Sequence, residues 1–307
     1  MTARADALQR LLDHLRERDY HFITPTPATH ARVIARPDMA AATDLRGAFG
    51  WSLPFAPDLL PQALRTALLE MQVLERAGAD RLHSRVRVSS LDDGLFLHSA
   101  YPTTSPDSVF FGPDSYRFVR FIAAELEQVP CPVRIVDLGA GSGVGGIMAA
   151  RLCPGADVVL LDINPAALEL AAVNARAAGV PATTLEAGSL AKVEGPVDLI
   201  LANPPFIIDA EERTYRHGGD MDGARVSYDW TLASAERLQS GGRMLLYTGV
   251  AIRDGQDPLR TALERDLSGC TLRYRELDPD IFGEELDRPA YAGIERIAAV
   301  GVEVIKD

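Results

Sequence analysis

The stretch that decides the fold is VRIVDLGAGSGVGGIMAA, which runs from Val133 to Ala150. A short apolar run ends at Asp137, five glycines follow from Gly139 to Gly146, and a run of small and apolar residues comes directly after them. This pattern predicts a buried β-strand, a tight turn and the start of a helix. Glycine lets a backbone approach a ligand closely, and a helix start offers unpaired N–H groups. The stretch therefore predicts a cofactor-binding turn.

The glycine spacing by itself leaves two kinds of cofactor open. Gly141, Gly143 and Gly146 satisfy the dinucleotide fingerprint G-x-G-x-x-G, which is typical of NAD-dependent dehydrogenases. Asp137 argues against that interpretation, because a carboxylate at the strand end would repel a pyrophosphate. The same carboxylate suits a ligand that carries an ammonium group.

A second motif, Asn203-Pro204-Pro205-Phe206, follows the apolar run Leu199–Ala202. Because that run predicts a buried strand, the motif lies at a carboxyl end of the sheet, where ligands bind in α/β folds. With the glycine turn, it makes the chain resemble the class I S-adenosylmethionine-dependent methyltransferases. More narrowly, the chain resembles the N-P-P-[FY] branch, which methylates planar nitrogens of glutamine side chains or nucleobases. The resemblance covers roughly residues 109–304.

The chemistry of a planar nitrogen explains each residue of the second motif. Such a nitrogen is a poor nucleophile because its lone pair is delocalised. If the side-chain oxygen of Asn203 and the carbonyl of Pro204 accept its two N–H bonds, the nitrogen is oriented toward the sulfonium methyl. Pro204 and Pro205 stiffen the turn, and Phe206 offers a face for stacking a planar group. These four residues are the predicted catalytic residues; an ordinary structural turn is the alternative.

The predicted cofactor site adds residues that follow the other strands. Asp162 ends the second strand 21 positions after Gly141, where an acid can accept both ribose hydroxyls; a helix cap before Pro165 is compatible with this role. Ser189 stands where the resembling family usually carries an acid or amide that faces the adenine. The resemblance also implies that Pro113 and Asp114 lie against the cofactor, with helix capping as the alternative. The full predicted set is Pro113, Asp114, Asp137, Gly139, Ala140, Gly141, Gly143, Asp162, Ile163, Asn164, Ser189 and Asn203.

The order of strands and helices predicts the architecture of residues 106–307. Strands are expected over 134–137, 158–162, 182–187, 197–202 and 243–250, and helices over 145–152, 166–178, 225–238 and 258–267. This alternation predicts a parallel sheet with helices on both faces. Strands over 272–277 and 296–304 fit the antiparallel sixth and seventh strands of the methyltransferase fold. The predicted fold class is therefore α/β, with a Rossmann-like seven-stranded sheet.

Residues 1–105 are predicted to form a separate α+β domain that recognises the substrate. Helices are expected over 3–18 and 60–77, and strand-like runs over 82–89 and 95–100 flank the turn signal Asp92-Asp93-Gly94. Helices followed by a hairpin can form a winged helix, a fold that reads DNA in some proteins and only packs in others. The segment does not match the helical release-factor-binding domain of the glutamine enzymes, which leaves the methyl acceptor open.

Composition limits the partners and the location. The chain has 307 residues and a formal charge of -12, which disfavours a nucleic-acid partner but leaves it open. Its three cysteines lack metal-ligand spacing, so neither a metal site nor a disulfide framework is expected. The N-terminus has no signal-peptide pattern and no run is apolar enough for a membrane span. We therefore expect a cytoplasmic protein without a membrane partner.

The expected activity is transfer of a methyl group from S-adenosylmethionine to a planar nitrogen. A protein glutamine amide ranks first as acceptor, then an rRNA or tRNA base (adenine N6 or guanine N2), then a small metabolite. A cofactor-binding but non-catalytic partner protein is the alternative from another class, and the intact Asn203–Phe206 motif argues against it. By resemblance, the glycine-rich loop from Tyr215 to Gly223 borders the substrate pocket. Within it, His217 is predicted to be a surface or lid histidine, because the reaction demands no general base.

Overall fold

The computed structural model describes residues 2–103, 105–127, 129–209 and 216–307. Its contacts divide the chain into two compact units that are interleaved in the sequence. Unit 1 comprises Met1–Arg117, Gly141–Val144 and Pro165–Pro181, and unit 2 comprises Phe118–Ala140, Gly145–Asn164 and Ala182–Asp307. The division into domains 1–105 and 106–307 stays a prediction.

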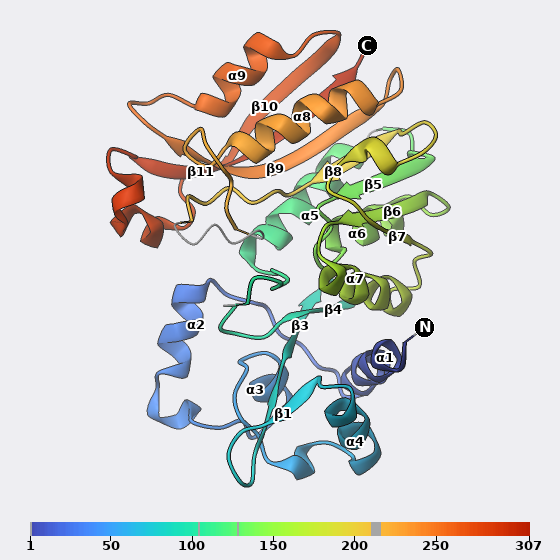
Figure 1. Cartoon of the computed structure of the whole chain (residues 1–307), viewed down its shortest axis with the longest axis vertical. Coiled ribbons are helices and arrows are strands. Elements are labelled where there is room, and N and C mark those ends of the chain that lie inside the picture. Colours follow the sequence, from blue (N-terminus) through green and yellow to red (C-terminus); the bar gives the residue numbers. More distant parts are fainter. Residues whose placement is uncertain (1, 104, 128, 210–215) are drawn as a thin grey trace. The chain divides into compact units, whose positions relative to one another are not determined.

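Unit 2 is built on the predicted seven-stranded sheet, whose order is β10-β11-β9-β8-β5-β6-β7 (Figure 1). The strands are β5 (Arg134–Leu138), β6 (Asp157–Asp162), β7 (Thr183–Glu186), β8 (Leu199–Ala202), β9 (Arg243–Ile252), β10 (Cys270–Asp278) and β11 (Arg296–Lys306). Within the group β5 to β9, every hydrogen-bonded pair of strands is parallel. Strands β10 and β11 form the predicted antiparallel pair, and β11 is also antiparallel to β9. The predicted α/β fold class is confirmed.

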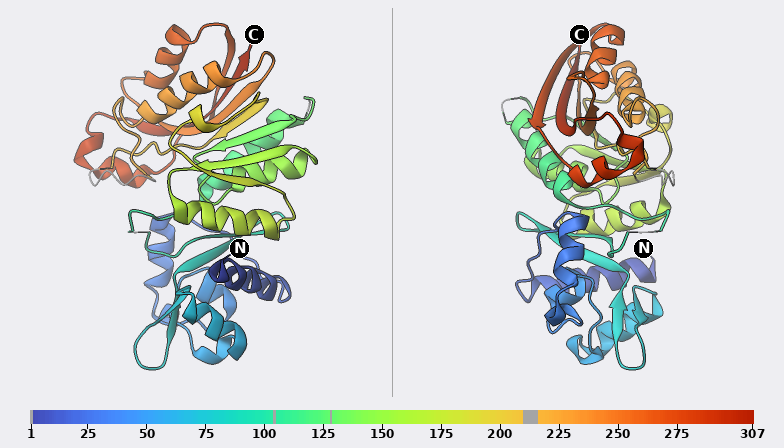
Figure 2. Two further views of the ribbon diagram at one scale, coloured as in Figure 1. Left: turned by 45° about the vertical axis from the view of Figure 1, so that its right-hand side comes forward. Right: turned by 90° about the vertical axis from the view of Figure 1, so that its left-hand side faces the viewer.

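Alternating side chains give the sheet of unit 2 two buried faces. On one face, Ile135, Leu199 and Tyr247 pack with apolar residues of α5 (Pro113–Leu126) and α6 (Val144–Leu152). On the other, Val136 and Ile200 pack with α8 (Arg225–Arg237) and α9 (Pro258–Asp266). Figure 2 shows the two helix layers on opposite sides of the strands. Short 3-10 helices complete the unit: η3 (Leu190–Lys192), η4 (Gly283–Asp287) and η5 (Pro289–Tyr291).

Unit 1 combines helices with two small antiparallel ribbons, as the predicted α+β character requires. Its ribbons pair β1 (Leu74–Arg76) with β2 (Leu82–Ser84), and β3 (Val86–Leu91) with β4 (Gly94–Ser99). The hairpin predicted at Asp92-Asp93-Gly94 is confirmed, because Leu91 pairs with Gly94. Its other elements are α1 (Ala3–Arg16), α2 (Pro27–Ile34), η1 (Pro37–Met39), α3 (Leu45–Phe49), η2 (Pro57–Leu59), α4 (Gln62–Glu70) and α7 (Pro165–Ala177).

Two predictions for unit 1 are wrong in extent. The helix expected over 60–77 ends at Glu70, because Gln72 has a φ of 54° and Leu74 begins a strand. Cross-strand pairing with Ser84 and burial of Leu74 override the helical spacing of the apolar residues. The strand-like run 82–89 is two strands, β2 and β3, in different ribbons.

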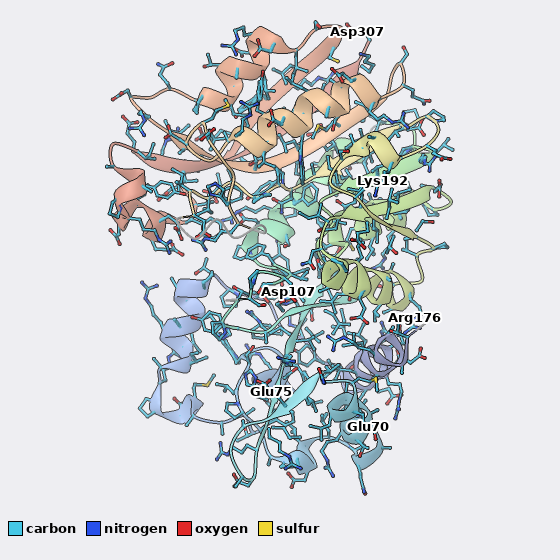
Figure 3. The ribbon with its side chains drawn as sticks, viewed as in Figure 1. Glu70, Glu75, Asp107, Arg176, Lys192 and Asp307 are labelled. Atoms are coloured by element: carbon cyan, nitrogen blue, oxygen red, sulfur yellow. The ribbon has the colours of Figure 1, made fainter. Side chains whose placement is uncertain are left out.

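Helix α7 lies between β6 and β7 in the sequence but belongs to unit 1 by its contacts. The Nε of its Arg176, labelled in Figure 3, donates to Gln9 Oε1 of α1 at 2.8 Å, and Nη2 donates to the carbonyl of Ala5 at 2.9 Å. Its Asn174 is fully buried and bonds both backbone groups of Leu97 on β4, accepting from N–H at 2.8 Å and donating to C=O at 3.0 Å. The amide of Asn174 therefore closes the outer edge of the β4 strand.

Candidate functional site

Three neighbouring strands of unit 2 end at the same level, and the predicted site residues follow them directly. In the sheet register, Leu138 of β5 lies opposite Leu161 of β6 and Ala202 of β8. The next residues along the chain are Gly139, Asp162 and Asn203. The fold therefore brings the glycine turn, the acid and the Asn-Pro-Pro-Phe motif to one edge of the sheet, as expected for a ligand site in this architecture.

Asp137 holds the start of helix α6. Its side chain is only 2% exposed, and Oδ2 accepts a hydrogen bond from Gly146 N at 2.7 Å. A carboxylate is favourable at a helix N-terminus. Burial nevertheless raises the pKa of Asp137 to about 7, the nearby charge of Asp162 contributes to this rise, and the hydrogen bond from Gly146 opposes both effects. The carboxyl group thus changes its charge near neutral pH.

Gly139 needs to be glycine for two reasons. Its φ is 71°, a left-handed conformation that side chains with a Cβ adopt at a cost. A Cβ built there would lie 2.5 Å from Cη2 of Trp230, so the indole of α8 rests directly on the glycine backbone. The N–H groups of Gly139 and Ala140 both donate to the Leu161 carbonyl, at 2.8 and 2.9 Å. These two N–H groups are therefore used within the sheet rather than presented to a ligand.

The residues predicted to hold the nucleoside lie around the ends of β6 and β7. Asp162 Oδ1 accepts from Asn164 N at 2.9 Å, which fixes the turn after β6. Ile163 is 52% exposed, although it is a large apolar residue. A Cβ on Gly188 would lie 3.3 Å from Ile163 Cγ2, so the turn after β7 approaches Ile163, and the next residue of that turn is the exposed Ser189. An exposed apolar side chain beside a hydroxyl fits a flat, polar-edged ring such as adenine.

In the Asn203–Phe206 segment, the side-chain amide of Asn203 is available to a ligand. Asn203 is partly exposed, and within the described part of the chain its side-chain amide has no recorded protein partner. Pro204 is buried, whereas Pro205 and Phe206 are partly exposed. The Phe206 ring lies against Gly249 of β9, where a Cβ would meet Cδ2 at 2.4 Å, and against Phe282 at 5.8 Å between centroids. The backbone and its neighbours therefore fix Phe206, while the amide of Asn203 is available to a ligand.

Two glycines of the following loop contact the motif directly. A Cβ on Gly218 would lie 2.7 Å from Phe206 Cα, and one on Gly223 would lie 2.3 Å from the Phe206 carbonyl oxygen. The next residues are also held, because Ile208 N donates to the hydroxyl of Tyr291 at 2.9 Å. The glycine-rich loop thus borders the motif through its backbone.

A cluster of charged side chains, Asp209, Arg216 and Glu285, includes residues that follow the motif in the chain. Arg216 forms ion pairs with Glu285 and with Asp209, the latter with 3.5 Å between Nε and Oδ1. His217 Nδ1 accepts a hydrogen bond from Asp209 N at 3.3 Å. His217 is partly exposed, and its role stays a prediction. Tyr215, also named in the prediction for this loop, lies outside the described residues.

Four residues of the predicted cofactor set belong to unit 1. Gly141 and Gly143 have φ values of 54° and 78°. Pro113 is the first residue of α5, as predicted for a helix opening, and Asp114 is 1% exposed with an ion pair to Arg117 at 3.5 Å. Contact of these four residues with a cofactor stays a prediction.

Sequence reasoning missed several residues that shape the site. Trp230, Tyr291 and Phe282 come from segments far along the chain, and only the fold brings them to the glycine turn and to the motif. One signal was present: an isolated glycine inside a strand, such as Gly249, often marks a close approach by another group. Here that group is the ring of Phe206.

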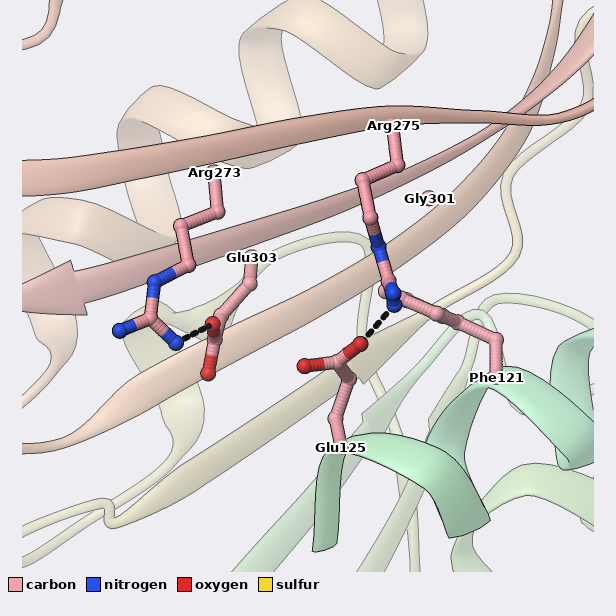
Figure 4. A pocket seen from close by; sticks show the side chains of 6 residues that line it. All are labelled: Phe121, Glu125, Arg273, Arg275, Gly301 and Glu303. Atoms are coloured by element: carbon pink, nitrogen blue, oxygen red, sulfur yellow. Dashed lines mark hydrogen bonds and ion pairs between the residues drawn. The ribbon is translucent and has the colours of Figure 1, made fainter.

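A separate cavity of about 160 Å³ lies in unit 2 between α5 and strands β10 and β11 (Figure 4). Its charged lining is paired: Arg273 Nη1 lies 2.9 Å from Glu303 Oε2, and Arg275 forms an ion pair with Glu125. None of the predicted site residues lines this cavity. It is therefore distinct from the candidate site.

Metal-binding clusters and membrane-spanning helices are both missing from the residues that the structure describes. Within them, no group of three or more His, Cys, Asp or Glu side chains is arranged to hold a metal ion. In the same part of the chain, no helix combines the length and apolar character needed to span a bilayer.

Comparisons with known proteins agree with this geometry. The sequence profile of the "Methyltransferase small domain" family matches residues 119–271. The chain is 30% identical over 183 residues to the release factor glutamine methyltransferase of Deinococcus radiodurans, covering 56% of this chain and 63% of that protein. It is 30% identical over 211 residues to the enzyme of the same name from Bordetella pertussis, covering 66% of this chain and 73% of that protein.

A third relative carries a different name. The chain is 36% identical over 113 residues to the ribosomal RNA small subunit methyltransferase C of Hahella chejuensis, covering 37% of this chain and 30% of that protein. The chain thus covers less than two thirds of the length of the first and third relatives, and more than two thirds of the length of the second. With the seven-stranded sheet and the residues at its carboxyl edge, these matches confirm the predicted resemblance. The chain belongs to the methyltransferase small domain family of class I S-adenosylmethionine-dependent methyltransferases.

Proposed function

We propose that the chain transfers a methyl group from S-adenosylmethionine to a planar nitrogen, and that this nitrogen is the side-chain amide of a protein glutamine. The observation that carries the proposal is Asn203, whose amide has no recorded partner within the described residues and follows the central strand β8. Its strand neighbour β5 ends in the glycine turn. An available hydrogen-bonding amide beside a cofactor turn is what methylation of a planar nitrogen requires.

The residues around the turn fit the proposed cofactor. Asp162 supplies a carboxylate for ribose hydroxyls, and Ile163 and Ser189 supply an apolar face and a hydroxyl for the adenine. The cofactor contributes an electrophilic methyl group on a sulfonium. The buried carboxyl of Asp137, whose pKa burial raises to about 7, gains a favourable partner if an ammonium group lies beside it.

The chain itself contributes orientation and hydrogen-bond acceptance. The side-chain oxygen of Asn203 and the carbonyl of Pro204 accept the two N–H bonds of the acceptor amide, which keeps the nitrogen lone pair directed toward the methyl group. The Phe206 ring, held by Gly249 and Phe282, stacks on the planar amide. The new N–C bond forms as the S–C bond breaks, and the nitrogen then loses one proton to solvent.

Two relatives named as release factor glutamine methyltransferases support a protein glutamine as acceptor. The relative named as a ribosomal RNA methyltransferase supports a base as the second candidate. The formal charge of -12 favours the protein acceptor, because proteins that bind nucleic acid broadly carry a basic surface. The cytoplasm, where both kinds of acceptor occur, is the proposed location.

The first test is isothermal titration of the purified protein with S-adenosylhomocysteine, with NAD as the control. We expect binding of the former only; binding of NAD alone would refute the assignment of the glycine turn. The second test transfers a labelled methyl group to a cell extract, with parallel protease and ribonuclease treatment of the products. Label that protease removes and ribonuclease leaves supports a protein acceptor, and the opposite result supports a base.

Variants at the motif separate catalysis from cofactor binding. Asn203→Ala should bind S-adenosylhomocysteine as the wild type does and lose about 100-fold or more in turnover, because positioning of the nitrogen is lost. Gln62→Ala, which removes an exposed side-chain amide at the start of α4 in unit 1, is the matched control and should leave both turnover and binding unchanged. Unchanged turnover in Asn203→Ala would rule out the proposed role of the motif.

A further inference from the structure

Among the described residues of unit 1, one buried arginine has no carboxylate partner. Arg87 of β3 is only 4% exposed, and its Nη2 donates to Thr24 Oγ1 at 3.1 Å. Its Nε has no hydrogen-bond acceptor among the residues that the structure describes. Within the described part of the chain, no ion pair to Arg87 is recorded. A buried charge without a countercharge is unfavourable, and proteins rarely retain one without a reason.

The groups around Arg87 are aromatic rings rather than acids. The guanidinium carbon lies 5.8 Å from the centroid of the Phe22 ring. Burial lowers the pKa of Arg87 to about 10, while Tyr20, Tyr116 and Tyr101 oppose that shift. The side chain therefore stays charged at neutral pH. Two of these tyrosines are already engaged: the Tyr20 hydroxyl donates to the Val88 carbonyl at 2.8 Å, and the Tyr116 hydroxyl accepts from Thr24 N at 3.1 Å.

A second unsatisfied polar atom lies in the same aromatic cluster. His30 is fully buried, and its ring lies 4.1 Å from Tyr101 and 5.1 Å from Trp51 between centroids. Its Nε2 lies 3.0 Å from the Trp51 carbonyl and donates to it, whereas Nδ1 has no partner within the described part of the chain. Trp51 in turn contacts Phe22, the ring beneath Arg87, at 5.2 Å. Unit 1 thus contains an unsatisfied cationic donor and an unsatisfied neutral acceptor within one network of packed rings.

We propose that Arg87 binds the carboxylate group of a small ligand within unit 1, at a site that is independent of the proposed function. A planar guanidinium matches a carboxylate with two parallel hydrogen bonds, and the surrounding rings exclude water, which strengthens the ion pair. The net charge of -12 disfavours a long run of backbone phosphates as the ligand.

The test compares three variants of the full chain by thermal denaturation. Arg87→Met removes the charge and keeps much of the volume, and Arg87→Lys keeps the charge but loses the planar fork. Arg46→Met is the matched control, because Arg46 is exposed and its guanidinium lies over the same Phe22 ring at 5.9 Å. Each protein is heated in rising concentrations of formate or acetate, with chloride holding the ionic strength constant and inorganic phosphate as a separate series.

We expect carboxylates to raise the Tm of the wild type and of Arg46→Met in a saturable way. Arg87→Met should lose this response and, without any carboxylate, unfold at a Tm no lower than that of the wild type, because an uncompensated buried charge is gone. Arg87→Lys should need about tenfold more carboxylate for half-saturation, since charged hydrogen bonds are lost. The fluorescence of Trp51, measured in a Trp230→Phe background, provides a second readout of the same saturation.

Three results would overturn the proposal. The first is that carboxylates raise the Tm of the wild type and of Arg87→Met equally. The second is that carboxylates do not raise the Tm of the wild type at all. The third is that phosphate raises the Tm in a saturable way and carboxylates do not. Titration with S-adenosylhomocysteine keeps the two proposals apart. If the cofactor product fails to bind while the response to carboxylate still depends on Arg87, the proposed function fails and the carboxylate site stands. If the cofactor product binds normally and no carboxylate response is seen, the carboxylate site fails and the proposed function stands.

Discussion

Binding of S-adenosylhomocysteine is expected to release a proton from Asp137. The carboxyl group is 2% exposed and accepts one hydrogen bond, from Gly146 N at 2.7 Å. Burial, helped by the charge of Asp162, raises its pKa to about 7. If the ammonium group of the ligand lies beside this carboxyl group, the ionised form gains a partner and its pKa falls on binding.

The size of the effect follows from the raised pKa. With a value of about 7, the protonated fraction of Asp137 is about 0.9 at pH 6, about 0.5 at pH 7 and about 0.1 at pH 8. The number of protons released per ligand should follow these fractions. Because the ligand favours the ionised form, affinity should rise with pH up to about 7 and then level off, with at most about a tenfold change per pH unit.

Isothermal titration in pairs of buffers with different ionisation enthalpies measures the released protons directly. At pH 7 the wild type should show a heat difference between phosphate and Tris that corresponds to about half a proton, and Asp137→Asn should show none. Equal heats in both buffers for the wild type would refute the reasoning. In that case no ammonium group lies beside Asp137, and its carboxyl group serves only to hold the start of α6.

Three other variants test separate parts of the structure. Asp137→Asn should be more stable than the wild type at pH 8 by up to about 4 kcal/mol, and this gain should vanish near pH 4. The reason is that the raised pKa makes ionisation of the wild-type carboxyl group costly, with a cost that grows from pH 4 to pH 7 and is complete above pH 7. Urea titrations of both proteins at each pH measure this difference in the free energy of unfolding. Gly249→Ala should displace the Phe206 ring, which would lie 2.4 Å from the new Cβ; steady-state assays should show lower turnover, and titration an unchanged affinity for S-adenosylhomocysteine. Asn174→Leu should leave both backbone groups of Leu97 unpaired and cost about 3 kcal/mol, with faster hydrogen exchange at the Leu97 amide.

The sequence predicts the sheet well because its signals are local. Each parallel strand is a short apolar run bounded by turn residues, and each helix keeps a clear spacing of apolar residues. The predicted ends of β5, β6 and β8 therefore locate Gly139, Asp162 and Asn203 at one edge of the sheet, where the structure has them. The helix expected over 60–77 fails for the opposite reason, since pairing of Leu74 with Ser84 is a contact that no local pattern reveals.

The contacts that complete the site are long-range and could not be read from the sequence. Trp230 rests on Gly139 across some ninety positions of the chain, and Tyr291 bonds Ile208 across a similar span. The unpaired state of Arg87 is also invisible in the sequence, because arginine usually lies exposed or beside an acid. Whether two side chains from distant segments are in contact is determined only by the packed structure.

The amide of Asn174 limits how this protein can have been assembled from parts. Helix α7 lies within residues 119–271, the segment shared with the methyltransferase family, yet its Asn174 satisfies the edge of β4 in unit 1. Residues 1–117 cut off from the rest would expose that edge and lose the contacts of Arg176 with α1. The N-terminal segment is therefore not an interchangeable module. A chimaera that takes residues 1–117 from a relative would need a matching α7 as well, because the β4 edge and the α1 contacts depend on Asn174 and Arg176.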